Sequence, residues 1–253
     1  MVNGLNIDQL LIPSSDCEAC IKAKQTHWPF PAEAKNRSNI PGERFMLDVW
    51  GPARVVSIRG WKYYISFCDD NIWYFMILFL QNKGEAASWI KEYIAKIKQK
   101  FGKAPMYMRI DNRRELLNNK IITFCQNEGI TIETTAPYSP SQNNVAKHFN
   151  WTLIKLVQAM IIAKDLPIFL WDKATTYITF IRNQSPTRDL KGKTPYEVWI
   201  GKKPDVSFLR EFRLEVWVLD ESRNRSKLEA KAKKVIFVGI MEGLKAIRFW
   251  DKI

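Results

Sequence analysis

Two aspartates stand in apolar, strand-like segments and could together bind a metal ion. Asp48 lies in the middle of the segment FMLDVW, and Asp111 ends the segment MYMRID. An unpaired charge in such surroundings is costly unless a metal ion or a partner receives it. If both segments are strands of one sheet, their carboxylates can meet at one edge of that sheet. Alternatively, each aspartate caps a turn or pairs with an arginine such as Arg109 or Arg113, and the residues alone leave both interpretations open.

A second candidate metal site is the cysteine pair near the N-terminus. Cys17 and Cys20 have the C-x2-C spacing that supplies half of a tetrahedral zinc site. The sequence has two histidines, His27 and His148, and none among residues 1–16. Because this segment cannot supply four ligands, we expect zinc not to bind. Four cysteines in 253 residues also suit a reducing compartment better than a disulfide framework.

The chain is strongly basic, with 39 Lys and Arg against 26 Asp and Glu, a formal net charge of +13 and a pI near 9.6. A hydrophobic content of 46% excludes a disordered tail. The positive charge is either a solvated surface or a binding surface for a polyanion, and nucleic acid fits best. The longest apolar run, residues 72–80, is about half as long as a membrane helix, and the N-terminus lacks the layout of a signal peptide. We therefore expect a soluble intracellular protein with no membrane partner.

Hydrophobic periodicity predicts the elements that must position these side chains. β-Branched and aromatic residues predict three antiparallel strands joined by two hairpins between residues 45 and 80. An amphipathic helix is predicted over residues 83–102. A strand, a helix, a strand and two helices follow, at residues 106–111, 121–129, 130–137, from 144, and 167–184. This order predicts an α/β fold, with a mixed sheet covered by helices.

The helix that begins near Asn144 has two distinct faces. Its apolar face carries Val145, Phe149, Leu153, Leu156 or Val157, and Met160. The opposite stripe carries Lys147, Trp151, Lys155 and Gln158. The first face predicts burial against the sheet. The second is either a solvated face or part of a nucleic-acid surface.

The C-terminal third predicts a linker and a small β module. Residues 186–212 are rich in proline and glycine and predict an extended linker. The segments LEVWVLD, KVIFVGI and AIRFWDKI predict three short strands. Residues 221–253 hold nine Lys and Arg against four Asp and Glu, a net charge of +5, interleaved with Phe237, Phe249 and Trp250. We interpret this module as a surface that could contact phosphates.

Ordered motifs along nearly the whole chain from Cys17 are those of one family. They are the C-x2-C pair followed by IKAKQTHWPF, then LDVWGP, YYISFCDD, IDNRRE, GITIETTAPYSPSQNNVAKHFN, LPIFLWDKA, KTPYEVWIGKKPDVSFLREF and KKVIFVGI. In these motifs the chain resembles the integrase of copia-type long-terminal-repeat retrotransposons. The resemblance implies a ribonuclease H-like core, with a mixed five-stranded sheet flanked by helices. It divides the chain into the remnant of a zinc-binding segment, the catalytic core, an extended linker and a small basic β module, at residues 1–40, 41–185, 186–212 and 213–253.

The resemblance also implies a set of metal ligands. Such integrases resemble enzymes in which two aspartates and a glutamate hold two Mg²⁺ or Mn²⁺ ions for phosphoryl transfer. By this resemblance, Asp48 and Asp111 are the first two catalytic, metal-binding acids. The glutamate should follow Asp111 after 35 intervening residues, and Lys147 stands at that position. Because a protonated lysine has no lone pair to offer a metal, the resemblance implies weakened metal binding.

Two further departures from the family pattern lie near these acids in the sequence. Arg113-Arg114 replaces paired glycines, and Asn143-Asn144 replaces Asn-Gly. Glycines at such places usually adopt φ > 0 or let a ligand approach closely. We therefore interpret the active site as degraded.

These observations lead to two alternative functions. The first is a DNA-binding integrase core whose DNA integration is impaired or lost, so that its status as an enzyme is uncertain. The resemblance implies a homo-oligomer in the nucleus, with a nucleic-acid surface made of Arg113, Arg114, Asn143, Lys147, Trp151 and Lys155. The second is a host-retained, non-enzymatic protein-interaction module on the same fold. The dependence of DNA affinity on salt separates the two, because phosphate neutralisation gives a steep slope.

Overall fold

The computed structural model describes residues 37–110, 116, 119–134, 144–163, 165–219, 230–241 and 246–251. The chain divides into two units, Met1–Lys35 and Asn36–Ile253, and all described residues belong to the second. The predicted Cys17-Cys20 pair and most of the predicted segment 1–40 therefore lie outside the described residues.

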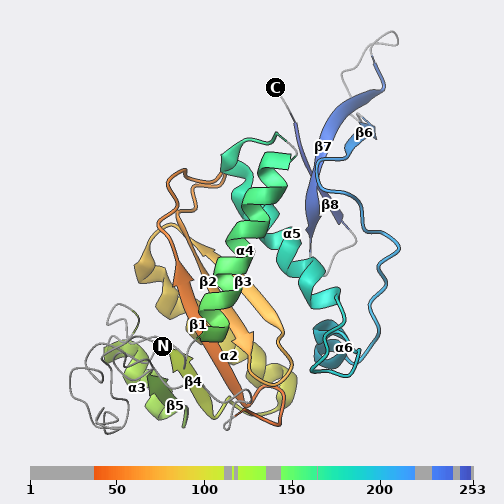
Figure 1. Ribbon diagram of the computed structural model, residues 1–253. Coiled ribbons are helices and arrows are strands. Elements are labelled where there is room, and N and C mark those ends of the chain that lie inside the picture. The colour runs from red at the N-terminus through yellow and green to blue at the C-terminus, as the bar shows by residue number, and fades with distance from the viewer. Residues whose placement is uncertain are drawn as a thin grey trace, which may run out of the picture. The chain divides into compact units, whose positions relative to one another are not determined.

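A mixed sheet of five strands forms the centre of this unit (Figure 1). Its order is β3-β2-β1-β4-β5, and the strands are β1 Arg44–Trp50, β2 Tyr63–Asp69, β3 Phe75–Leu80, β4 Tyr107–Ile110 and β5 Thr131–Thr134. The first three strands pair antiparallel, whereas β4 pairs parallel with β1 and with β5. The predicted α/β fold with a mixed five-stranded sheet is therefore confirmed.

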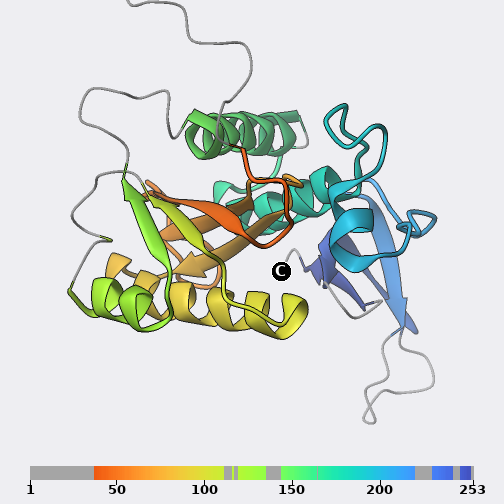
Figure 2. The same ribbon diagram turned by 90° about the horizontal axis from the view of Figure 1, so that it is seen from below.

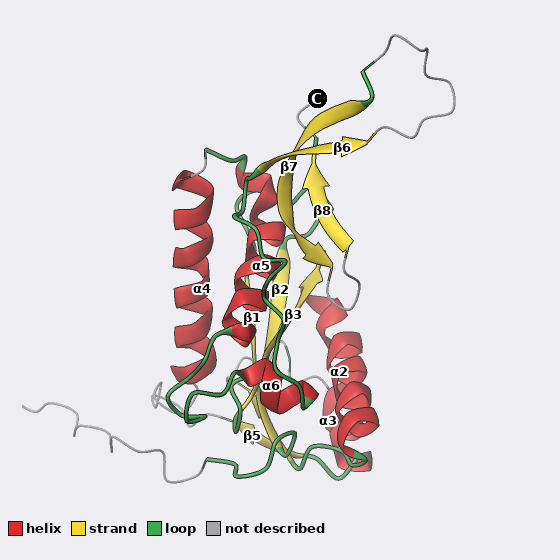
Figure 3. Ribbon diagram, turned by 90° about the vertical axis from the view of Figure 1, so that its right-hand side faces the viewer, coloured by secondary structure: helices red, strands yellow, loops and turns green. Residues whose placement is uncertain are grey.

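Helices cover both faces of the sheet, as Figures 2 and 3 show. The helices α2 Ala86–Phe101 and α3 Asn119–Asn127 lie on one face, and α4 Asn144–Ala163 and α5 Trp171–Gln184 lie on the other. Alternate residues of β1 point to opposite faces, so Phe45 and Leu47 pack with α2, whereas Met46 packs with α4 and α5. This alternation places Asp48 on the α4 side of the sheet.

The helix boundaries follow from local signals in the sequence. Helix α2 buries Ile90, Tyr93, Ile94 and Ile97 at helical spacing, and Gly102 ends it in the left-handed conformation, with φ of 74°. A short 3-10 helix, Ile168–Leu170, follows Pro167 and leads into α5, which ends before Ser185 as predicted. None of the helices in the described ranges is long and apolar enough to cross a bilayer.

The predicted extended linker, residues 186–212, contains a helix and is therefore not extended throughout. The helix α6, Pro195–Ile200, begins at Thr194, whose Oγ1 accepts a hydrogen bond from the Glu197 N–H at 2.9 Å. Proline at the first helical position has the φ that a helix requires. Trp199 is buried and stacks on Tyr74, with ring centroids 4.6 Å apart and planes at 2°. The composition predicted a loop, but the Thr-Pro start and the burial of Trp199 favour a helix.

A second sheet follows, with three antiparallel strands as predicted. They are β6 Glu215–Leu219, β7 Ala232–Met241 and β8 Ala246–Trp250, in the order β6-β7-β8. Phe237 of β7 is 1% exposed and packs edge-on against Tyr177 of α5, with ring centroids 5.5 Å apart. Phe237 therefore belongs to the core, and our expectation that it is interleaved with surface charges was wrong. Trp250 is half-buried against the ring of Phe169, and Phe249 is exposed.

Candidate active site

Asp48 is a buried carboxylate in the central strand of the larger sheet. Its side chain is 8% exposed, and its neighbours along β1 are almost all apolar. Oδ1 accepts a hydrogen bond from the N–H of Val49 at 3.0 Å, and Oδ2 accepts one from Asn150 Nδ2 at 3.0 Å. These two bonds offset part of the free energy that burying the carboxylate costs.

Asn150 joins Asp48 to the neighbouring strand. It is 4% exposed on α4, and its Oδ1 accepts a hydrogen bond from the Tyr64 hydroxyl of β2 at 3.3 Å. Burial raises the pKa of Tyr64, and the charge of Asp48 raises it further. The Tyr64 hydroxyl therefore stays protonated and donates to Asn150 throughout the neutral range. One helix and two strands thus fix the position of the Asp48 carboxylate.

The parallel pairing of β1 with β4 bears on the second predicted acid. Leu47 is the register partner of Ile110, and in the sequence these residues directly precede Asp48 and Asp111. The strands thus have the pairing that the predicted meeting of the two acids requires. Asp111 itself lies outside the described residues, so that its approach to Asp48 stays a prediction.

Arg109, one of the alternative partners considered for an aspartate, pairs with a different carboxylate. Its Nε and Nη2 lie 3.0 and 2.9 Å from Glu133 Oε2, and Arg44 contacts the other oxygen of Glu133 at 3.1 Å. The other alternative, Arg113, lies outside the described residues, as do Arg114 and Asn143. Asp48 instead has the amide of Asn150 as a hydrogen-bond donor.

Asp48 and Lys147 line the same cleft. The cleft has a volume of about 520 Å³ and lies between the end of β1 and the helix α4. Asn150, Trp151 and Lys155 also line it. The predicted first acid and the lysine at the position of the third acid are therefore brought together, with Asn150, Lys155 and Gln158 of α4 lining the same cleft.

The described donors of this cleft do not fit a pair of divalent cations. Mg²⁺ and Mn²⁺ sites of this kind are built from several carboxylate oxygens. Among the described residues that line it, the cleft has one carboxylate, that of Asp48, which already accepts two hydrogen bonds and shares the cleft with the ammonium group of Lys147. Within the part of the chain that the structure describes, no three His, Cys, Asp or Glu side chains gather closely enough to hold a metal ion.

The outward face of α4 presents an aromatic ring between basic groups. Trp151 is 58% exposed, and the Lys155 Nζ lies 3.5 Å from its ring centroid. The His148 ring lies 5.9 Å away on its other flank. The buried face carries Phe149, Leu153 and Val157, so that Val157 rather than Leu156 completes it. The predicted division of this helix into an apolar and a polar face is present over these residues.

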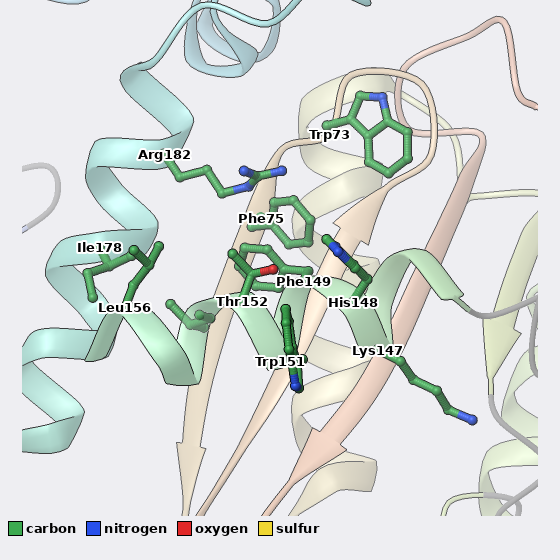
Figure 4. Close-up of a pocket in the computed structure, with 11 residues that line it drawn as sticks. Trp73, Phe75, Lys147, His148, Phe149, Trp151, Thr152, Leu156, Ile178 and Arg182 are labelled. Carbon is green, nitrogen blue, oxygen red and sulfur yellow. The ribbon is translucent and has the colours of Figure 1, made fainter. Parts of the chain in front are cut away.

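A second hollow lies beside the cleft, between α4, α5 and the start of β3 (Figure 4). It has a volume of about 770 Å³. Its floor is the stacked pair Phe75 and Phe149, with ring centroids 3.4 Å apart. The Arg182 guanidinium reaches over both rings, at 5.1 and 5.4 Å from their centroids. Lys147 borders both hollows, and in Figure 4 its side chain extends away from these aromatic rings.

Sequence reasoning missed Asn150, Tyr64 and Arg182. Asn150 lies one helical turn after Lys147, and this spacing was the available signal for a side chain in the same cleft. Tyr64 and Arg182 carried no such signal, because only the packing of distant elements brings them to α4.

Comparisons with known proteins agree with this architecture. The family model described as "Retroviral polymerase SH3-like domain" matches residues 215–253, which hold the second sheet. The chain is 27% identical over 237 residues to the retrovirus-related Pol polyprotein from transposon TNT 1-94 of Nicotiana tabacum, covering 94% of the chain. It is 23% identical over 223 residues, 88% of the chain, to the Pol polyprotein from transposon RE2 of Arabidopsis thaliana. The chain spans 18% and 15% of the lengths of these two relatives.

A solved structure shows the same fold. The chain resembles the simian T-cell lymphotropic virus intasome in complex with PP2A regulatory subunit B56 gamma, with a TM-score of 0.57 at 15% identity. This match covers 92% of the chain and 84% of the solved one. The HTLV-2 integrase catalytic core domain in complex with magnesium has a TM-score of 0.46 at 16% identity, over 64% of this chain and 99% of that one.

Proposed function

Because this chain is a copia-type retrotransposon Pol polyprotein region with the integrase core fold, we propose that it binds DNA but is impaired in DNA strand transfer. The single observation that carries this proposal is the cleft that Asp48 and Lys147 share. A charge of +1 placed 4 Å from a divalent ion costs on the order of 8 kcal/mol, before relaxation, at an effective dielectric constant of 20. Lysine at this position therefore opposes the binding of two catalytic cations.

The DNA-binding part of the proposal rests on charge and on the α4 surface. Lys147, Trp151 and Lys155 lie at i, i+4 and i+8 on one helix, where they can contact successive phosphates and bases. The net charge of +13 favours a polyanionic partner. We propose that Arg113, Arg114 and Asn143 belong to the same surface, and that the protein self-associates in the nucleus. We also propose that residues 41–185 form the catalytic core and residues 213–253 the basic module.

A strand-transfer assay with Mn²⁺ tests the proposed impairment. We expect the wild type to join DNA ends no faster than Asp48→Asn, which lacks the first acid. Lys147→Glu should gain Mn²⁺ binding, measured as a rise in melting temperature with added Mn²⁺. Lys147→Gln is the matched control, because it removes the ammonium group without adding a carboxylate. Efficient joining by the wild type that Asp48→Asn abolishes would refute the proposal.

The second candidate function is a non-enzymatic scaffold for a protein partner. It is favoured by the exposed apolar side chains of the second sheet, which include Trp217, Leu219, Ile247 and Phe249. DNA affinity measured against salt concentration separates the two functions. A DNA-binding core gives a steep log–log slope, whereas a protein scaffold gives almost none.

A further inference from the structure

We propose that the second hollow, beside Trp151, receives an unpaired base of a DNA strand held in the Asp48 cleft. This inference rests on the proposed DNA binding and adds the kind of DNA that the site prefers: a strand end with unpaired nucleotides. The juxtaposition that carries it is an exposed tryptophan ring standing between a polar cleft and an apolar, cationic hollow.

Trp151 separates the two hollows. Lys155, which covers one face of the Trp151 ring at 3.5 Å, lines the Asp48 cleft and not the second hollow. His148, on the other flank of the ring, lines the second hollow and not the cleft. Trp151 itself lines both hollows. A flat aromatic ring that enters the second hollow can stack against the exposed part of the Trp151 ring.

The second hollow has the chemistry of a base pocket. Its walls are mainly aromatic and aliphatic, with Phe75, Phe149, Leu156 and Ile178 among them. Its volume of about 770 Å³ lies in the range of ordinary small-ligand pockets. Single-stranded nucleic acid is bound in this way by other proteins, through aromatic side chains that stack bases and cations that neutralise phosphates.

The positive charge of the second hollow favours an anionic partner such as nucleic acid over a cationic one. Its lining holds the cationic side chains of Lys147 and Arg182, and among its described lining residues there is no carboxylate. In Figure 4 the guanidinium of Arg182 extends from α5 across the ring of Phe75. Its N–H groups are donors that match the oxygen and ring-nitrogen acceptors on the edges of bases.

The two hollows adjoin each other along α4, so one strand can reach both. Lys147 and Trp151 line each of them. A backbone that passes Lys147 and Lys155 in the cleft would place the next base at the Trp151 ring. In a fully paired duplex that base is held in the stack, and only an unpaired base can turn into the hollow without breaking a base pair.

The test compares two DNAs. One is a blunt duplex of about 30 bp, or about three helical turns, and the other is the same duplex with unpaired nucleotides at one 3′ end. Affinities of the full chain for both are measured by fluorescence anisotropy, with 2-aminopurine among the unpaired nucleotides. Stacking of one base predicts that the wild type binds the DNA with the unpaired end about five- to tenfold more tightly. The 2-aminopurine fluorescence should fall on binding.

Three variants assign the preference to Trp151. Trp151→Ala should abolish it, so that the two DNAs bind with the same affinity, and Trp151→Phe should keep most of it because a ring remains. Trp217→Ala is the matched control, since Trp217 is 69% exposed but lies on β6, away from both hollows. It should leave the ratio of the two affinities unchanged.

The outcomes separate this inference from the proposed function. Salt-dependent binding of both DNAs with equal affinity, unaltered in ratio by Trp151→Ala, would overturn the base pocket and leave the proposed DNA binding intact. Loss of the preference in Trp217→Ala instead of Trp151→Ala would place base stacking on the second sheet and also overturn it. Failure to bind either DNA would overturn both.

Discussion

Replacing Asn150 with alanine removes the hydrogen bond that holds the Asp48 carboxylate. The lost bond joins an amide N–H to a buried charged acceptor at 3.0 Å, an interaction worth about 1.5–3 kcal/mol. The same change leaves the buried Tyr64 hydroxyl without its acceptor, which costs about 1–3 kcal/mol more. We therefore expect Asn150→Ala to lower the free energy of unfolding by about 3–5 kcal/mol.

A double-mutant cycle measures how much of this loss comes from Asp48. Urea unfolding of the wild type, Asp48→Asn, Asn150→Ala and the double variant gives the coupling free energy, which we expect to be about 2 kcal/mol. Asn183→Ala is the matched control. Asn183 is equally buried, at 4% exposed, but it exchanges hydrogen bonds with the backbone of Phe75, at 3.0 and 2.7 Å.

The control should be destabilised by a similar amount, yet its effect should add to that of Asp48→Asn. If Asp48→Asn and Asn150→Ala also add, to within about 0.5 kcal/mol, then Asn150 does not hold the carboxylate and the reasoning fails.

Two further predictions concern pH and close packing. Burial raises the pKa of Tyr64 in the folded state, so the hydroxyl of the unfolded chain ionises first as the pH rises through 10. The free energy of unfolding should therefore fall above that pH. Tyr64→Phe should reduce this fall by about 1.4 kcal/mol per pH unit between pH 10 and 12, as measured by urea unfolding. Gly42→Ala should destabilise the protein by about 1–3 kcal/mol more than Gly192→Ala. Both positions have positive φ, but a Cβ at Gly42 would lie 2.5 Å from the Phe101 ring, whereas a Cβ at Gly192 would have no atom within 4 Å. Equal melting temperatures for the two variants would contradict this prediction.

Much of the larger sheet could be predicted because its signals are local. β-Branched and aromatic residues marked β1, β2 and β3, and the spacing of Ile90, Tyr93, Ile94 and Ile97 marked α2. The helix α6 was missed because its proline and glycine neighbours dominated the composition, while its stability depends on Trp199 packing against Tyr74, far away in the sequence.

The candidate site could be predicted only in part, for the same physical reason. Asp48 was recognisable because a charge in an apolar strand stands out, and Lys147 because of its position in a family pattern. The hydrogen-bonded contact of Asp48 with Asn150 depends on how α4 crosses β1, which no local pattern encodes. Asp111, Cys17 and Cys20 lie outside the described residues, and their roles stay predictions.

The packing of β7 on α5 has a mechanical consequence. Phe237 packs against Tyr177, a Cβ added at Gly239 would lie 3.7 Å from the Tyr177 Cβ, and the Tyr177 hydroxyl donates a hydrogen bond to the Arg210 carbonyl. These contacts join the small sheet to α5, so we expect the two to move together. A fragment that ends after Ser185 would expose the apolar surface of α5 that β7 covers. Because exposed apolar patches promote aggregation, we expect such a fragment to aggregate more readily than the full chain.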